Sequence, residues 1–465
     1  MKFFNTWTRE KEEFKPFDKT EVKIYSCGPT VYNFAHIGNL RTYIFADILK
    51  RVLMYAGYKI KHAMNVTDVG HLTDDGDTGE DKMEKAARME NKSAKEIADF
   101  YWQAFREDLA KLNISEPTIW CRASEYINEQ IDLIKRLEEK GYTYKISDGI
   151  YFDTSKTKDY GYLGRLDIKG LNEGARVAAN EEKRNPTDFA LWKFSPIDRK
   201  RQQEWESPWA PPGQDKAFGF PGWHTECVAM ALKCLGAPID IHTGAIDLAP
   251  VHHTNEIAQA QALLNKKFVQ LWMHGEFVII NDKKMAKSEG NFLTLNGLVE
   301  QGYDPISYRY LCLTTHYRSK LNFNFEALSA AQTGLNNLRE RFLNLGKASG
   351  SAMDELKKQF AEAIADDLNM PQVMALSWAV LKSDASDADK RATLLDFDKV
   401  LGLNLENYQE QLVEIPDDVK KMAEEREKAR QKKNWKRSDQ LRDELDKLGW
   451  IIRDTSVGYE LKKKI

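Results

Sequence analysis

The chain has 465 residues, of which 42% are hydrophobic and 30% are charged, a composition that excludes a largely disordered chain. The length favours about three domains, and the net charge of −3 excludes a globally basic nucleic-acid-binding protein. Residues 1–10 lack the apolar core of a secretory signal, and no apolar run approaches the ~20 residues of a transmembrane helix, so we expect no membrane partner.

Residues 22–66 carry the first strong pattern: a strand, a loop, a helix and a second strand. Residues 22–27 are rich in strand-forming side chains, and the helix begins at His36-Ile37-Gly38-Asn39. Its apolar residues recur as in a buried amphipathic helix until Gly57 ends it. With a strand over residues 59–66, the unit is typical of a right-handed βαβ crossover. N–H groups at the helix start suit a nucleotide phosphate, although an ordinary helix start has the same pattern.

The next part of the chain predicts the end of one half of a sheet and then an insertion. Residues 65–68 lie at a predicted strand end, where doubly wound folds bind ligands. Residues 91–112 and 124–140 favour helices, and Ser124 is the predicted N-cap of the second. Short strand patterns, turns and many charges then predict an insertion over residues 120–205, between two halves of a parallel sheet.

Helix–strand alternation resumes after Pro221 and leads into a helix bundle. The predicted elements are a helix at 223–235, a strand at 239–242 before a turn at Gly244, a helix at 252–264, a strand at 271–280, a helix at 303–316, helices over 324–402, one charged helix at 419–448 and a strand near residue 450.

The C-terminal segment is locally basic. Residues 417–465 contain fifteen Lys/Arg and eleven Asp/Glu, a local charge of +4 that leaves −7 on the rest of the chain. This segment, and not the chain as a whole, therefore indicates a nucleic-acid partner.

A lysine-rich loop follows the predicted strand that ends near residue 280. Residues 283–288 read K-K-M-A-K-S. Lysines on such a loop can neutralise the charge that develops on ATP phosphates during adenylyl transfer. The alternative is a solvated basic loop, and the loop sequence alone does not distinguish the two.

Four residues form a candidate metal site. Cys27 ends the first strand and Cys227 lies on the helix that begins near residue 223. His252 and Glu256 are four residues apart, so they share one helix face. Two thiolates, an imidazole and a carboxylate are reasonable zinc ligands, although this spacing is not that of a compact zinc finger.

The alternative assigns both of these cysteines to the core, which is common for free cysteine. We assign Cys121, Cys234 and Cys312 to the core, and Cys234 has no companion two helical turns after Cys227. A sparse, odd set of five cysteines argues against a disulfide framework and indicates a reducing cytosol.

Two short motifs, H-I-G-N at 36–39 and K-M-A-K-S at 284–288, resemble the signatures of class I aminoacyl-tRNA synthetases, usually H-I-G-H and K-M-S-K-S. The chain resembles the cysteinyl-tRNA synthetase family over essentially its whole length. The similarity rests on Y-S-C-G-P-T-V-Y-N-F-A-H-I-G-N at 25–39, K-R-N-P-T-D-F-A-L-W-K at 183–193, P-G-W-H-T-E-C at 221–227, H-H-T-N-E-I-A-Q at 252–259, K-M-A-K-S-E-G-N at 284–291 and H-Y-R-S-K-L at 316–321.

The resemblance implies an α/β fold with a Rossmann-like, doubly wound parallel sheet split by an insertion. The implied domains are catalytic halves at 1–119 and 206–281, a connective insertion at 120–205, a stem-contact element with the K-M-A-K-S loop at 282–325, a helical bundle at 326–408 and an anticodon-binding domain at 409–465. The implied reaction activates L-cysteine with ATP to cysteinyl-adenylate and transfers it to the 3′ end of tRNA(Cys). We expect a cytoplasmic monomer.

The resemblance also assigns residues to four roles. One zinc ion, held by Cys27, Cys227, His252 and Glu256, selects the thiolate of substrate cysteine. The catalytic residues are His36, Asn39, Lys284 and Lys287, and ATP with Mg²⁺ is bound by His36, Gly38, Asn39 and Lys287. The cysteine pocket is lined by Tyr25, Gly28, Thr67 and Trp223. The anticodon is read by Arg430, Trp435, Asp439, Arg442 and Asp454.

Two motif positions differ from the family pattern, and two other functions remain possible for this sequence. Asn39 replaces a second His, but its amide can still donate a hydrogen bond, and Ala286 replaces a loop Ser, so we expect function to be retained. A cysteine ligase of the mycothiol-pathway type shares the catalytic half but lacks the module at 409–465. A catalytically inactive tRNA-binding paralogue would not require His36, Lys287 or the four metal positions.

Overall fold

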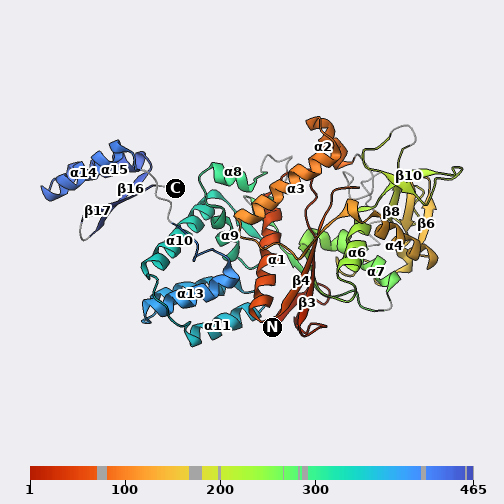
Figure 1. The fold of residues 1–465 in the computed structure, drawn as a ribbon, viewed down its shortest axis with the longest axis horizontal. Coiled ribbons are helices and arrows are strands. Elements are labelled where there is room, and N and C mark those ends of the chain that lie inside the picture. Colours follow the sequence, from red (N-terminus) through yellow and green to blue (C-terminus); the bar gives the residue numbers. More distant parts are fainter. Residues whose placement is uncertain are drawn as a thin grey trace. The chain divides into compact units, whose positions relative to one another are not determined.

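The structure, a computed structural model, describes residues 1–465 except 71–80, 167–180, 197–199, 265, 281–282, 285–291, 410–414, 456–457 and 464–465. It divides into two compact units, Met1–Val299 with Asp304–Leu405, and Glu300–Tyr303 with Glu406–Ile465. Figure 1 labels their helices and strands. Within the described residues, no helix combines the length and apolar composition that crossing a membrane requires.

A five-stranded parallel sheet organises the first unit. Its order is β12-β11-β3-β4-β5, and every neighbouring pair is parallel. The strands are β3 (Glu21–Ser26), β4 (Lys59–Val66), β5 (Ile119–Arg122), β11 (Ile239–Ala245) and β12 (Val269–Gly275). The chain winds outward in one direction through β4 and in the other through β12, so the switch point lies between β3 and β11, where such sheets bind ligands. The predicted doubly wound α/β fold is confirmed.

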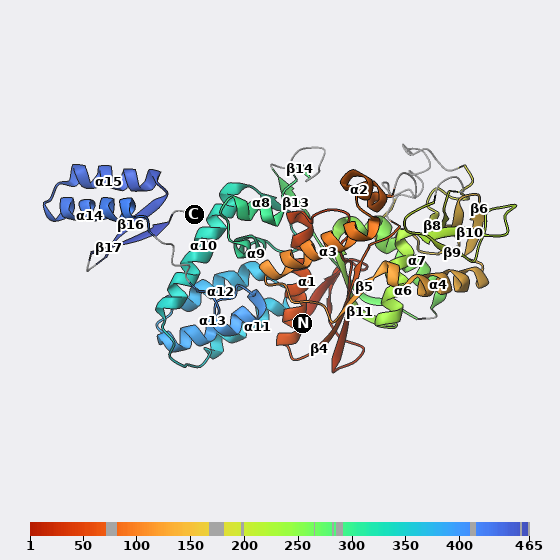
Figure 2. The ribbon, with the colours of Figure 1, turned by 45° about the horizontal axis from the view of Figure 1, so that its top comes forward.

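Helix α1 (Ile37–Tyr55) joins β3 to β4 and begins as the sequence predicts. His36 is its N-cap: the Asn39 N–H donates to His36 Nδ1, and the His36 N–H donates to Asn39 Oδ1. Gly57 follows the helix with a φ of +92°, a conformation that glycine adopts without strain. α1 lies on one face of the sheet, and α6 (Trp223–Cys234) and α7 (Thr254–Leu263) lie on the other (Figures 1 and 2).

The insertion forms its own antiparallel sheet in the order β6-β7-β8-β10-β9. Its strands are β6 (Thr143–Ile146), β7 (Gly149–Phe152), β8 (Phe189–Phe194), β9 (Trp205–Ser207) and β10 (Ala217–Pro221). Both expected insertion boundaries therefore shift. Residues 120–122 pair within the parallel sheet, and residues up to 221 pair within the insertion, because main-chain hydrogen bonding decides to which sheet a short strand belongs.

Among the residues described between β4 and β6, three form α-helices: α2 (Lys82–Glu90), α3 (Ala94–Lys111) and α4 (Ile127–Glu139). The sequence patterns miss α2, which ends at Asn91 in the left-handed conformation, so α3 begins later than the expected residue 91. Ser124 is not the N-cap of α4. It lies in a 3-10 turn, and its N–H and hydroxyl donate to Asp68 at 2.9 and 2.7 Å, which anchors the turn beside the end of β4.

Two expectations about the second half of the sheet are wrong. The predicted turn at Gly244 is part of β11, because pairing with β12 continues through Ala245. The predicted strand at 271–280 is two strands, β12 and β13 (Val278–Ile280), and the second pairs with β14 (Lys283–Lys284) and β15 (Leu321–Phe323) in a separate sheet. Alternation of side chains does not reveal where a strand changes its partner.

Helices make up most of the remaining first unit, together with an N-terminal hairpin. These elements are β1 (Lys2–Asn5), β2 (Glu10–Glu13), α8 (Leu295–Glu300), α9 (Pro305–Leu313), α10 (Phe325–Asn344), α11 (Asp354–Ala365), α12 (Met370–Lys382) and α13 (Asp387–Leu401). Arg309 of α9 is fully buried and donates to Asp47 of α1 and to the Leu401 carbonyl, each at 2.7 Å. The bundle is thereby tied to the helix that follows the central strand.

The second unit contains α14 (Asp417–Gln431), α15 (Trp435–Lys447), β16 (Trp450–Thr455) and β17 (Gly458–Lys463). The single helix expected over 419–448 is wrong: the chain reverses near Lys433, whose φ is +59°, and Asn434 caps α15. The reversal lets both helices bury apolar residues with the hairpin in one small core. A continuous helical pattern cannot reveal such a reversal, because the period is the same on both sides of the break.

Candidate metal centre and nucleotide-binding residues

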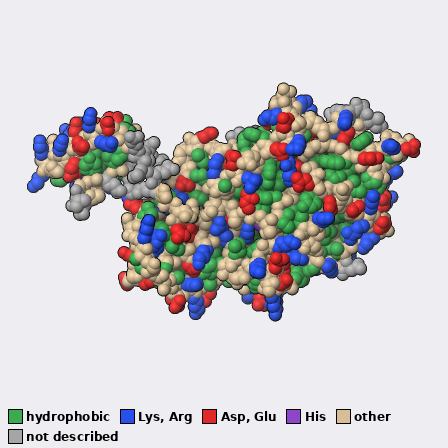
Figure 3. Space-filling view, in the orientation of Figure 1, with side chains coloured by type: hydrophobic (Ala, Val, Ile, Leu, Met, Phe, Trp, Pro, Cys, Tyr) green, Lys and Arg blue, Asp and Glu red, His purple; other side chains and the backbone are tan. Residues whose placement is uncertain are grey.

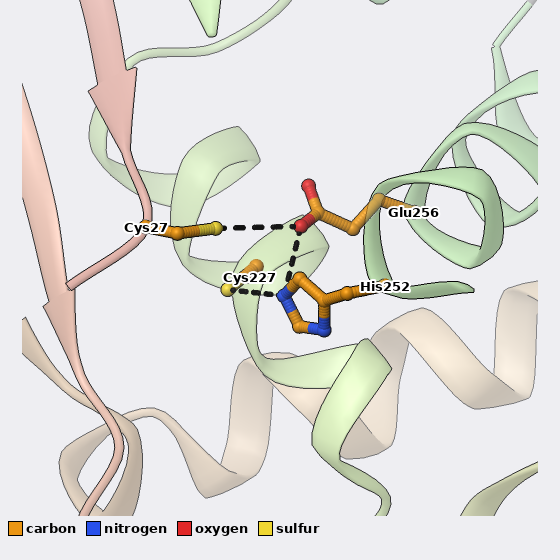
Figure 4. A group of neighbouring side chains, drawn as sticks. All are labelled: Cys27, Cys227, His252 and Glu256. Carbon is orange, nitrogen blue, oxygen red and sulfur yellow. Dashed lines mark hydrogen bonds and ion pairs between the residues drawn. The ribbon is translucent and has the colours of Figure 1, made fainter. Parts of the chain in front are cut away.

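Four side chains converge at the carboxyl end of β3. Cys27 directly follows β3, Cys227 lies in α6, His252 lies in a π-helical turn (Ala249–His253) before α7, and Glu256 lies in α7. Figure 4 shows their ligand atoms facing one another, and all of these atoms lie within 4.8 Å of one another. The fold therefore brings the four predicted metal-site residues together.

The donor atoms are closely spaced and buried. His252 Nε2 lies 3.0 Å from Glu256 Oε1 and 3.4 Å from Cys227 Sγ. Cys27 Sγ lies 3.8 Å from Glu256 Oε1. Their residues are at most 8% exposed. Two thiolates, an imidazole and a carboxylate are donors that zinc binds in a tetrahedron, so the chemistry of this set fits a zinc ion.

The electrostatics of the cluster favour negative charge on two donors. A hydrogen bond from Cys27 lowers the pKa of Cys227 to about 6, although burial opposes it. Burial raises the pKa of Glu256, but the charges of His242 and His252 and their hydrogen bonds outweigh it and lower that pKa well below its usual value. Burial lowers the pKa of His252, yet Cys227 and Glu256 raise it to about 10. Anionic donors in a buried setting favour a divalent cation.

Besides His224, whose Nδ1 lies 3.0 Å from His252 Nδ1, three further histidines surround these four residues. His242 Nε2 of β11 lies 2.8 Å from Glu256 Oε2, and His253 Nε2 lies 3.2 Å from Cys27 Sγ. On its other side, His253 Nδ1 lies 2.7 Å from His274 Nε2 of β12. Such outer partners fix the orientation of metal ligands. Sequence reasoning missed all three, although a histidine on a strand next to the first strand was an available signal for His242.

Two predicted cysteine-pocket residues contact the cluster through their rings. The ring centroids of Tyr25 and His242 lie 5.1 Å apart, and those of Trp223 and His252 lie 4.5 Å apart. Tyr25 is fully buried, and its hydroxyl has no hydrogen-bond partner among the described residues. A buried hydroxyl of this kind can pair with a polar group of a small ligand.

Gly28 and Thr67, the other two pocket residues, lie at the ends of β3 and β4. A Cβ on Gly28 would lie 1.7 Å from the Asn65 carbonyl oxygen, so only glycine fits there. Thr67 donates to Glu226 Oε2 at 3.0 Å. Glu226 was not assigned from the sequence; it is fully buried, and Oε1 has no hydrogen-bond partner among the described residues. An unpaired carboxyl oxygen beside the cluster can accept from a ligand ammonium group.

The predicted nucleotide-binding residues at the start of α1 are partly exposed. His36 and Asn39 are joined by the reciprocal capping bonds described above. The Asn39 side-chain N–H₂ group makes no hydrogen bond to any described residue, and Asn39 is exposed. A Cβ on Gly38 would lie 2.9 Å from the His36 ring, so glycine leaves room for the ring in this position. The helix start can therefore present donors to an anion.

The lysine-rich loop is only partly described. Lys284 pairs with Ile279 in the ladder of β13 and β14. Lys287 and Ala286 lie outside the described residues.

The five predicted anticodon residues lie in the second unit. Trp435, the first residue of α15, is 58% exposed. Arg430 of α14 forms an ion pair with Asp454 of β16. Arg442 Nη2 lies 3.4 Å from Asp439 Oδ1. On the visible face of this unit, basic and acidic side chains are interspersed (Figure 3). The structure thus brings these residues together as two ion pairs and one exposed indole ring.

Two solved structures share the fold of this chain. Methionyl-tRNA synthetase of Mycobacterium tuberculosis, in complex with methionyl-adenylate, matches with a TM-score of 0.54 and 15% identity over 83% of this chain and 90% of its own. An Agrobacterium radiobacter K84 LeuRS-tRNA-LeuAMS complex matches with a TM-score of 0.59 and 10% identity over 84% of both chains. These likenesses concern the fold alone. A family model described as "tRNA synthetases class I (C) catalytic domain" matches residues 13–333 and defines the class.

Closer relatives identify the family within that class. A model described as "Cysteinyl-tRNA ligase anticodon binding domain" matches residues 412–459. Cysteine–tRNA ligase 1 of Burkholderia lata is 48% identical, over 99% of this chain and 96% of the relative. Cysteine–tRNA ligase of Treponema denticola is 41% identical, over 100% of this chain and 99% of the relative. The chain therefore belongs to the cysteine–tRNA ligase family.

Proposed function

We propose that this protein activates L-cysteine with ATP to cysteinyl-adenylate, with release of diphosphate, and transfers the cysteinyl group to the 3′ end of tRNA(Cys). The observation that carries the proposal is the buried group of Cys27, Cys227, His252 and Glu256 at the switch point of a doubly wound sheet. The two relatives described above, both named cysteine–tRNA ligases, support the same reaction.

The four clustered residues would hold one zinc ion. When bound, zinc supplies a soft Lewis acid for the substrate thiolate, which a serine hydroxyl matches poorly. An ordinary pocket discriminates such near-isosteres weakly. Tyr25 and Glu226 bring a buried hydroxyl and a carboxyl oxygen that lack partners among the described residues, and Glu226 suits the substrate ammonium group. Gly28 keeps the end of β3 closely packed against Asn65.

The second substrate, ATP with Mg²⁺, would bind at the start of α1 to His36, Gly38 and Asn39. The exposed Asn39 amide supplies a donor where the family usually has histidine. Lys284 and Lys287 would neutralise the charge that grows on the phosphates in the transition state. Lys287→Ala should therefore lower the rate of adenylate formation by roughly 10²–10³-fold while cysteine affinity changes little. A large rise in the cysteine KM alone would contradict this role.

For tRNA, we assign anticodon reading to residues 409–465. Trp435 offers a stacking surface, and Arg430, Asp439, Arg442 and Asp454 offer groups for base edges once their ion pairs exchange. The presence of this module argues against a mycothiol-type ligase. We further propose that the protein acts in the cytoplasm as a monomer.

The proposed function is tested by ATP–diphosphate exchange with cysteine, followed by charging of tRNA(Cys). We expect exchange that depends on cysteine and not on serine, and cysteinyl transfer only to tRNA(Cys). An inactive paralogue would show no exchange, and a ligase for a small-molecule amine would show exchange without tRNA charging. A chain truncated after Gln409 should keep near-parental exchange and lose charging that depends on the anticodon.

A further inference from the structure

A pair of cysteines outside the metal centre lies in direct contact. Cys121 is in β5 and Cys234 is the last residue of α6, and their Sγ atoms lie 3.0 Å apart. The expectation that Cys234 has no companion is therefore wrong, because the companion is 113 residues away in sequence. Both are free thiols. Their separation is only about 1 Å longer than a disulfide bond of about 2.05 Å.

The surroundings make Cys234 the more reactive member. It is the one cysteine of the five that is partly exposed, whereas the other four are buried. The Tyr126 hydroxyl lies 3.5 Å from Cys234 Sγ. A hydrogen bond from Cys121 lowers the pKa of Cys234 to about 6, with further help from Tyr126 and the charge of Lys61, while the same bond raises the pKa of Cys121. An accessible thiolate beside a second thiol is the arrangement of a redox-sensitive cysteine pair.

We propose that Cys121 and Cys234 form an intramolecular disulfide when the protein meets a peroxide. The Cys234 thiolate attacks one peroxide oxygen, a sulfur–oxygen bond forms, the oxygen–oxygen bond breaks, and the leaving oxygen departs as water after protonation. The Cys121 sulfur then attacks the Cys234 sulfenic acid. The sulfur–sulfur bond forms, the sulfur–oxygen bond breaks, and the Cys121 proton leaves with that oxygen as a second water.

The cross-link would join β5 to the C-terminal end of α6 without using the metal-centre thiols. Cys234 lies seven residues, and thus about 10 Å along the helix, beyond Cys227. Cys27 and Cys227 are enclosed by the cluster of histidines and Glu256, so the partly exposed Cys234 meets the oxidant first. Oxidation at this pair and loss of the metal-centre thiols are therefore separable events.

Peptide mapping tests the proposal directly, because trypsin places the five cysteines in five different peptides: residues 24–41, 112–122, 217–233, 234–266 and 310–318. The full-length protein is treated with limiting hydrogen peroxide, denatured, alkylated and digested without reductant. We expect free thiols to fall from five to three per chain. A cross-linked peptide of 112–122 with 234–266, lighter than their sum by two hydrogen atoms, should appear, while 24–41 and 217–233 are recovered alkylated.

Matched variants separate this pathway from general oxidation. Cys121→Ser should stop at the Cys234 sulfenic acid, which dimedone traps, and Cys234→Ser should leave Cys121 reduced under the same dose. Cys312→Ser should cross-link like the parent, since Cys312 is buried in α9. The proposal is overturned if the parent protein loses the thiols of 24–41 or 217–233 before the cross-link appears. It is also overturned if Cys234 is oxidised while Cys121 stays alkylatable.

Discussion

The candidate metal centre and the predicted anticodon residues of the second unit differ in how far the fold alone arranges their side chains for binding. At the metal centre, donors from β3, α6 and α7 are buried and already held by each other and by outer histidines. In the second unit, Arg430, Asp454, Asp439 and Arg442 are paired with one another near the surface, and Trp435 is exposed. A small substrate is best met by a preorganised site, whereas a macromolecular partner must exchange existing ion pairs for its own contacts.

The largest expected effect comes from removing one of the four candidate zinc ligands. Cys227→Ala should lower zinc affinity by at least about 10³-fold, because even the loss of an outer partner costs about 10–100-fold. Cysteine activation and rejection of serine should be lost together. Metal analysis after gel filtration and exchange assays with each amino acid measure both effects.

Cys312→Ala is the matched control, since this cysteine is also buried but lies in α9 outside the cluster. It should keep one zinc per chain. If Cys227→Ala also kept zinc and rejected serine as the parent does, the cluster would not be the selector.

A smaller change probes the outer histidines. His242→Ala removes the group 2.8 Å from Glu256 Oε2 and should lower zinc affinity by about 10–100-fold, with the four ligand candidates intact. His242→Gln keeps a side-chain donor and should recover part of the loss. Competition with a chelator of known affinity measures each variant. If the parent, His242→Ala and His242→Gln bound zinc with equal affinity, His242 would not help to orient the zinc ligands.

Trp435 tests the predicted anticodon residues of the second unit, because its side chain is exposed. Trp435→Ala should weaken tRNA(Cys) charging by about 1–3 kcal/mol in transition-state terms, the usual contribution of one stacked base. ATP–diphosphate exchange should not change. Trp435→Phe keeps a ring and should retain most of the charging, and Phe218→Ala, an exposed aromatic residue of the insertion sheet, should have no effect. Normal charging by Trp435→Ala would remove this residue from the anticodon assignment.

The smallest effect concerns the ion pairs of the second unit. A hydrogen bond from Arg426 lowers the pKa of Asp454, so this carboxylate stabilises the folded unit above its unfolded pKa of about 3.9 and loses that contribution as pH falls through the folded value. Asp454→Asn should cost less than about 1 kcal/mol at pH 7, because solvent screens the pair, and the cost should be smaller at pH 2. Denaturant unfolding of both proteins at the two pH values measures this difference. An undiminished difference at pH 2 would contradict the assigned cause.

The sequence by itself determined the parts of this protein that depend on local pattern. The βαβ unit from β3 to β4, the helix start near His36 and the stop at Gly57 follow from periodicity and backbone preference, which neighbouring residues settle. The family motifs also indicated the four candidate metal ligands, and the fold brings their ligand atoms within 4.8 Å of one another.

Only the tertiary structure decided the features that depend on distant partners. His242 and His274 lie beside the candidate metal centre because β11 and β12 place them there, and His253 because the turn before α7 does. Cys121 meets Cys234 because β5 packs near the end of α6. The same reason explains the missed reversal near Lys433, the continuation of β11 through Gly244 and the shifted ends of the insertion sheet. In each case the deciding contact or hydrogen bond joins segments whose separation in sequence leaves no local pattern to read.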